Sequence, residues 1–125
     1  NLFEDLKLEN FSILPGSELK LLKGLQLGCS GIITATCNVT AQLSRKVYED
    51  FFSDKNQSHN QKLCEVRGIF DKYNLISGLH TFCSQEDKIY KNILTPLRLL
   101  NSKEEKNLIE DLKNLNIKKN SNLAD

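Results

Sequence analysis

Two short runs of β-branched and apolar residues limit what this chain can fold into. Residues 11–14 end at Pro15-Gly16, and residues 32–36, Ile-Ile-Thr-Ala-Thr, carry no charge, which is typical of a strand buried on both faces. A helix over residues 18–27, stopped by Gly28, is predicted between them. Strand, helix and strand with short joins form a unit with parallel strands. Two such strands cannot close a sheet, so we expect neighbouring strands on either side.

The rest of the chain has helical periodicity from Thr40 onward. Further helices are predicted over residues 75–82 and 84–92, and Ser102-Lys103-Glu104-Glu105 is a candidate capping box for a last helix to about residue 115. Leucines and Phe3 within residues 2–8 are typical of the last turns of another helix. Residues 118–125 form a polar tail.

Composition excludes several classes of function. The 17 basic and 16 acidic residues leave a net charge of +1, which provides no electrostatic footprint for nucleic acid or an anionic membrane. Apolar runs are too short to span a membrane, and no signal sequence is evident, so a soluble cytoplasmic protein is expected. The four cysteines form no C-x-x-C pair and are expected to be free thiols. His59 and His80 are isolated, so no metal site is predicted.

Several motifs carry a resemblance to a known family. They are Leu-Pro-Gly-Ser-Glu at residues 14–18, Gly24, Leu-Gly-Cys-Ser-Gly-Ile-Ile-Thr-Ala at residues 27–35 and Asn38-Val39. Thr-Pro-Leu-Arg-Leu-Leu at residues 95–100, followed by the candidate capping box, adds a C-terminal match. Together they resemble the dihydrodipicolinate synthase and N-acetylneuraminate lyase family of pyruvate-dependent class I aldolases.

The resemblance implies an α/β fold: the C-terminal part of a (β/α)8 TIM barrel, with strands 7 and 8 and their helices, plus a helical extension. Residues 1–55 would end the barrel, residues 56–117 would form the C-terminal helical region, and residues 118–125 would form the tail. The family's Schiff-base lysine lies on the sixth strand, which would place it upstream of Asn1. We therefore expect no catalytic residue in this chain and no activity from the chain alone.

The resemblance also implies how residues near the strand ends are used. Gly16 would let backbone approach a bound keto acid, and Ile33 would form an apolar wall beside the Schiff base. Ser17 and Asn38 are possible rim residues, although Ser17 followed by an acid also predicts a helix cap and Asn38 also fits a structural turn. The implied partners are pyruvate or another 2-keto acid and further copies in a homotetramer, with no cofactor, metal, nucleic acid or membrane.

One segment departs from the pattern of the synthase branch. That branch usually has an Asn-Pro-hydrophobic-Pro-hydrophobic-Lys run where residues 74–80 read Asn-Leu-Ile-Ser-Gly-Leu-His. A synthase-like condensation of pyruvate with an aldehyde stays the first hypothesis. An N-acetylneuraminate lyase or a 2-keto-3-deoxy sugar acid aldolase is the alternative within the family.

Two hypotheses from other classes are kept. A non-catalytic interaction module derived from a barrel would fold cooperatively as 125 residues, whereas an enzyme fragment with open strand edges would aggregate or become molten. A small nucleotide-binding domain would need a glycine-rich loop after a strand at a helix start. Residues 15–18, Pro-Gly-Ser-Glu, fit that loop poorly, and Gly28-Cys29-Ser30-Gly31 precedes a predicted strand, as a structural turn would.

Overall fold

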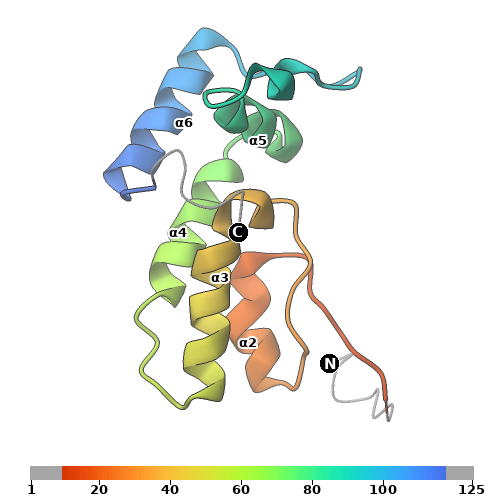
Figure 1. The fold of residues 1–125 in the computed structure, drawn as a ribbon, viewed down its shortest axis with the longest axis vertical. Helices are drawn as coiled ribbons and strands as arrows, with labels where there is room; N and C mark the ends of the chain where they lie inside the picture. The colour runs from red at the N-terminus through yellow and green to blue at the C-terminus, as the bar shows by residue number, and fades with distance from the viewer. Residues whose placement is uncertain (1–9, 118–125) are drawn as a thin grey trace.

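A computed structural model describes residues 10–117 of the chain (Figure 1). Helical elements joined by turns and extended segments make up this range. In chain order they are the 3-10 turn η1 (Glu18–Lys20), α2 (Leu21–Gln26), α3 (Cys37–Phe52), α4 (Asn60–Phe70), α5 (Leu75–Cys83), the 3-10 turn η2 (Lys88–Lys91) and α6 (Ser102–Asn114). The predicted helix over residues 2–8 and the predicted tail over residues 118–125 lie outside the described range.

The two predicted strands are extended segments without regular sheet pairing. Within residues 10–117 no strand is formed, but the Ser30 amide donates to the Ile13 carbonyl at 3.0 Å and the Ile33 amide donates to the Pro15 carbonyl at 3.1 Å. Both bonds advance in the same direction along the two segments, as in a parallel pair. Each of the two extended segments lacks a hydrogen-bonded neighbour on its outer edge. Because an isolated pair of strands is only marginally stable, the regular ladder that defines a strand does not form. The prediction of strands is corrected to this incomplete pairing.

The predicted helix over residues 18–27 is confirmed as η1 followed by α2. Gly28 ends it with φ of +89°, a left-handed conformation that glycine adopts without steric cost. The predicted helix over residues 84–92 is wrong: within it only η2 forms, capped by the Asp87 side chain on the Ile89 amide at 2.9 Å. Asp87 has an extended backbone, as is usual for an N-cap residue whose carboxylate accepts a hydrogen bond from the amide two residues later. The polypeptide therefore leaves the helical conformation at Asp87 before η2 begins.

The last helix begins one residue earlier than the sequence pattern indicated. Asn101, and not Ser102, is the N-cap of α6, and its side chain accepts from the amides of Lys103 and Glu104 at 3.1 and 2.9 Å. Glu104 completes the box by accepting from the Asn101 amide at 3.1 Å. The predicted box is therefore present, with its register shifted by one residue.

The helices enclose two apolar cores that share α4. Leu63 of α4 packs with α2 and α3 in the first core, while Val66, Ile69 and Phe70 pack with α5 and α6 in the second. Phe70 meets Phe82 edge to face with ring centroids 6.1 Å apart. Figure 1 shows α2, α3 and α4 side by side and α5 and α6 above them. Helix α4 thus joins the predicted barrel end to the predicted C-terminal helical region.

No helix in the described range is both long and apolar enough to cross a membrane.

Candidate functional site

The structure brings together the two residues predicted to touch a keto acid. A side chain built on Gly16 would find only the Ile33 carbonyl oxygen nearby, at 3.8 Å, which is ordinary contact. The absent side chain therefore leaves open space beside Ile33. Ile33 is 71% exposed, so most of its surface is free of contact with the described residues.

The two predicted rim residues make local hydrogen bonds. The Ser17 hydroxyl accepts from the Leu19 amide at 3.3 Å, so the predicted helix cap is confirmed. The Asn38 side-chain amide donates to the Ala35 carbonyl at 2.8 Å and fixes the turn that leads into α3. Both side chains therefore make local structural hydrogen bonds.

Beside Gly16 and Ile33 lies a buried carboxylate, Glu18, which the sequence suggested either as a substrate contact at the mouth of the barrel or as the acid of a helix start. Glu18 is fully buried, with 0% exposure, although it belongs to the short turn η1. Its Oε2 accepts from Thr34 Oγ1 at 3.0 Å and from Arg67 Nη1 at 2.9 Å, and its Oε1 accepts from Thr40 Oγ1 at 2.9 Å and from Thr36 Oγ1. We call Glu18, Arg67 and the three threonines the carboxylate cluster.

The carboxylate cluster draws on four segments of the chain. Glu18 comes from η1, Thr34 and Thr36 from the second extended segment and the turn after it, Thr40 from the first turn of α3, and Arg67 from α4. Arg67 is held from the other side as well, because its Nε donates to Asp71 Oδ1 at 2.8 Å. The cluster therefore links η1, which follows the first extended segment, and the second extended segment to helices α3 and α4.

The surroundings of Glu18 keep it ionised. Burial alone would raise its pKa, but hydrogen bonds from Thr36, Arg67, its own backbone amide and Thr40 outweigh burial and leave the pKa below its usual value. A carboxylate of this kind is a poor proton acceptor near neutral pH. The cluster consequently fits a role in holding the backbone better than a role in proton transfer.

Sequence reasoning could find only part of this cluster. Thr34 and Thr36 alternate along an extended run and share a face, and Thr36 and Thr40 are one helical turn apart, so a hydroxyl-lined patch was readable. Arg67 lies 49 residues beyond Glu18 in the sequence, and no local pattern connects the two. Only the packing of α4 against η1 brings them together.

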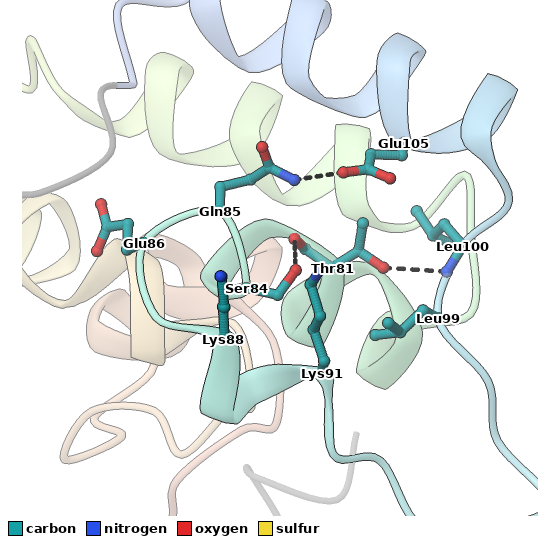
Figure 2. Close-up of a pocket in the computed structure, with 9 residues that line it drawn as sticks. All are labelled: Thr81, Ser84, Gln85, Glu86, Lys88, Lys91, Leu99, Leu100 and Glu105. Atoms are coloured by element: carbon teal, nitrogen blue, oxygen red, sulfur yellow. Dashed lines mark hydrogen bonds between the residues drawn. The ribbon is translucent and has the colours of Figure 1, made fainter.

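A hollow of about 340 Å³ lies between α5, η2 and the segment before α6 (Figure 2). Its buried hydroxyls are already used: Thr81 Oγ1 accepts from the Leu100 amide at 3.0 Å, and Ser84 Oγ donates to the Thr81 carbonyl at 2.8 Å. Two lysines of η2 and two glutamates also line it, so its charges balance. Among the described residues, this hollow offers no uncompensated charge that would select a ligand.

The two histidines have separate partners. His59 Nδ1 lies 3.0 Å from Asp50 Oδ2, and His80 Nδ1 lies 2.8 Å from the Tyr90 carbonyl oxygen. In the part of the chain that the structure describes, no three His, Cys, Asp or Glu side chains gather as a metal-binding group.

Comparison with known proteins bears on this assignment. Residues 3–115 match the sequence pattern of the Dihydrodipicolinate synthetase family, whereas a search of curated proteins found no match. The family is one of class I aldolase-like enzymes built on a TIM barrel. The match includes both extended segments, the carboxylate cluster and helices α2 to α6. The chain belongs to the dihydrodipicolinate synthetase family.

Proposed function

We propose that this chain is the C-terminal part of an aldolase that forms a lysine imine with pyruvate or with another 2-keto acid. The observation that carries the proposal is the placement of Gly16 against Ile33, at paired ends of two extended segments, in a chain that matches an aldolase family over residues 3–115. Active sites of (β/α)8 barrels lie at the C-terminal ends of their strands. The predicted strands at residues 11–14, which Gly16 closes, and at residues 32–36 would be strands 7 and 8 of that barrel.

The reaction needs little from this chain except shape. A lysine amine adds to the ketone carbon of pyruvate, water leaves, and the resulting iminium accepts the electron pair when a proton leaves the adjacent carbon or when a carbon–carbon bond breaks. Gly16 would admit the keto acid close to backbone, and Ile33 would keep water from the imine. An apolar wall also lowers the pKa of the lysine, since burial disfavours its charged form.

The lysine itself would be contributed by sequence upstream of Asn1, so we propose that the 125 residues alone have no activity. The remaining strands of the barrel would also pair the free edges of residues 11–14 and 32–36. A homotetramer and a cytoplasmic location, both implied by the family resemblance, belong to the same proposal.

Residues 74–80 bear on which aldolase this is. Asn74 caps α5 by accepting from the Ser77 amide at 3.1 Å, and the segment contains neither proline of the usual synthase run. Leu79 stands at the position of that run's lysine, and the Nδ1 atom of the next residue, His80, lies 2.8 Å from the Tyr90 carbonyl oxygen. A synthase-like condensation stays the first candidate, and these departures keep cleavage of N-acetylneuraminate or of 2-keto-3-deoxy sugar acids as the alternative.

Substrate competition separates these activities in the full-length gene product. The protein would be incubated with pyruvate, and candidate aldehydes would be added next. A borohydride would be added last, to reduce the remaining pyruvate imine to a stable secondary amine. A true acceptor aldehyde lowers the yield of trapped pyruvate by consuming the enamine, and a sugar-derived 2-keto acid that is a substrate gives trapped pyruvate by itself. Absence of any trapped keto acid on the folded full-length protein would contradict the proposal and favour a non-catalytic module.

A further inference from the structure

We infer that Arg67 is a positioning residue for the keto acid pocket, acting through Glu18. This inference rests on the proposed function. It means that α4, which belongs to the predicted C-terminal helical region, helps to shape a pocket at the predicted barrel end. Neither composition nor local sequence pattern assigns that part to Arg67.

The wall of the pocket has few anchors of its own. Gly16 has no side chain, and the Ile33 side chain is 71% exposed, so neither residue anchors itself by packing. Two backbone hydrogen bonds join the two extended segments directly, from the Ser30 amide to the Ile13 carbonyl at 3.0 Å and from the Ile33 amide to the Pro15 carbonyl at 3.1 Å, and only the second involves a wall residue. The position of the wall therefore depends on neighbouring residues.

Those neighbouring residues meet at one carboxylate. Glu18 lies two residues after Gly16, and Thr34 directly follows Ile33. Their side chains are joined by the bond from Thr34 Oγ1 to Glu18 Oε2 at 3.0 Å. Movement of either wall residue would disturb this bond, so the carboxylate acts as a clamp across the open space.

Arg67 holds this clamp in place. Its Nη1 donates to Glu18 Oε2 at 2.9 Å and lies 3.1 Å from Thr34 Oγ1, so one nitrogen contacts both halves of the wall. Its Nε donates to Oδ1 of Asp71, the C-cap residue of α4, at 2.8 Å, and the Arg67 side chain is only 12% exposed. A guanidinium fixed on two sides is a more rigid support than a lysine ammonium would be.

A buried ion pair of this kind is expected to control geometry more than stability. Removing one partner leaves a buried charge unpaired and strongly destabilises the folded protein, whereas replacing both partners by neutral groups of similar size is often tolerated. The double variant E18Q/R67M should therefore fold while losing the rigid link. That separation allows pocket geometry to be tested apart from folding.

The experiment uses the full-length gene product and pyruvate as the probe. Intact mass spectrometry after borohydride reduction gives the fraction of trapped protein at increasing pyruvate, and hence the half-saturating concentration. We expect E18Q/R67M to raise this concentration about tenfold, because pocket misplacement weakens binding of the keto acid while the lysine chemistry is intact at saturation. R67K keeps the positive charge but loses the planar guanidinium with its fixed set of donors, so its half-saturating concentration should lie between those of the double variant and the wild type.

The matched control is R45M/E49Q. It removes another Arg–Glu pair, with Nε and Oε1 2.7 Å apart, that is exposed on α3 and whose hydrogen bond does not involve the carboxylate cluster. The control should trap pyruvate as the wild type does; an equal shift in the control would overturn the inference.

A folded E18Q/R67M protein with the wild-type half-saturating concentration would likewise overturn it. Should the double variant fail to fold by circular dichroism, R67K decides, and an unshifted R67K contradicts the positioning role. If the wild type itself traps no keto acid, the proposed function fails first and the positioning role falls with it. Trapping in the wild type without any shift in the variants rejects the positioning role alone.

Discussion

The extended segments and the helices of this chain bury their apolar side chains to very different degrees. Phe11 and Ile33 are 62% and 71% exposed, whereas Val66, Phe70 and Leu108 are completely buried. Helices satisfy their backbone hydrogen bonds internally and need a partner for one face only, and α4, α5 and α6 provide such faces for one another. A strand also needs neighbours for its edges. The same chain is thus self-sufficient where it is helical and incomplete where it is extended.

The largest effect should come from opening the completed helical core. Phe70→Ala in the full-length protein is expected to lower the free energy of unfolding by about 3–5 kcal/mol, because the ring is buried and its removal leaves a cavity against Phe82. Phe52→Ala is the matched control, since that ring is 62% exposed on α3, and it should change the stability by less than about 1 kcal/mol. Guanidinium unfolding measures both. Equal losses of unfolding free energy in the two variants would contradict the view that Phe70 belongs to a closed core and Phe52 to the surface.

Hydrogen exchange compares the extended segments with the helices directly. In the 125-residue chain, most amides of residues 11–14 and 32–35 should exchange rapidly, because the structure provides them with few acceptors. In the full-length protein we expect the same amides to slow by roughly 100-fold or more as neighbouring strands pair with them. Amides of α4 serve as the internal reference and should slow less than these, because the helix supplies its own acceptors in either case. Unchanged exchange in residues 32–35 would argue against a barrel around these segments.

Acid should weaken the link between the extended segments and the helices. The pKa of Glu18 in the folded protein lies below its usual value of 4.5. The stability that this ionised carboxylate contributes is therefore complete above that value and is lost as pH falls through the lower, folded pKa. Unfolding midpoints measured from neutral into acidic pH should fall more steeply for the wild type than for E18Q/R67M. Parallel curves would show that the carboxylate does not contribute in this way.

The smallest losses of stability should come from removing helix caps, one in the helical region, at α6, and one beside the extended segments, at η1. Asn101→Ala removes a cap with two amide hydrogen bonds and one half of a capping box, and should cost about 1 kcal/mol. Ser17→Ala removes a single longer bond of 3.3 Å at a three-residue turn and should cost about half as much. Thermal unfolding of the two variants side by side tests the order. A larger loss for Ser17→Ala would indicate that Ser17 does more than cap η1.

Local patterns were sufficient for most of the helices and insufficient for the extended segments. Apolar spacing and the stop at Gly28 predicted the helix over residues 18–27 because a helix is determined by interactions within a few residues. The cap of helix α6 was predicted one residue late, since both Asn101 and Ser102 are good cap residues and only the backbone shows which one is used. The β-branched run at residues 32–36 indicated a preference for extended backbone, but a strand forms only beside partners.

The candidate site was predictable to the same extent. Family motifs drew attention to Gly16 and Ile33, and the structure places these two residues next to each other, although their contact with substrate stays a prediction. The carboxylate cluster was missed because its cation, Arg67, lies on a helix far along the sequence. Long-range pairing of that kind follows from packing, and packing is what a single sequence conveys least.

Reductive trapping of the full-length gene product with pyruvate decides whether these residues complete the pocket of an aldolase. We expect one added group per chain, with the mass of pyruvate less one water plus two hydrogens, on a lysine upstream of Asn1. A folded full-length protein that gains no mass, or that is modified only on a lysine within these 125 residues, would contradict the assignment.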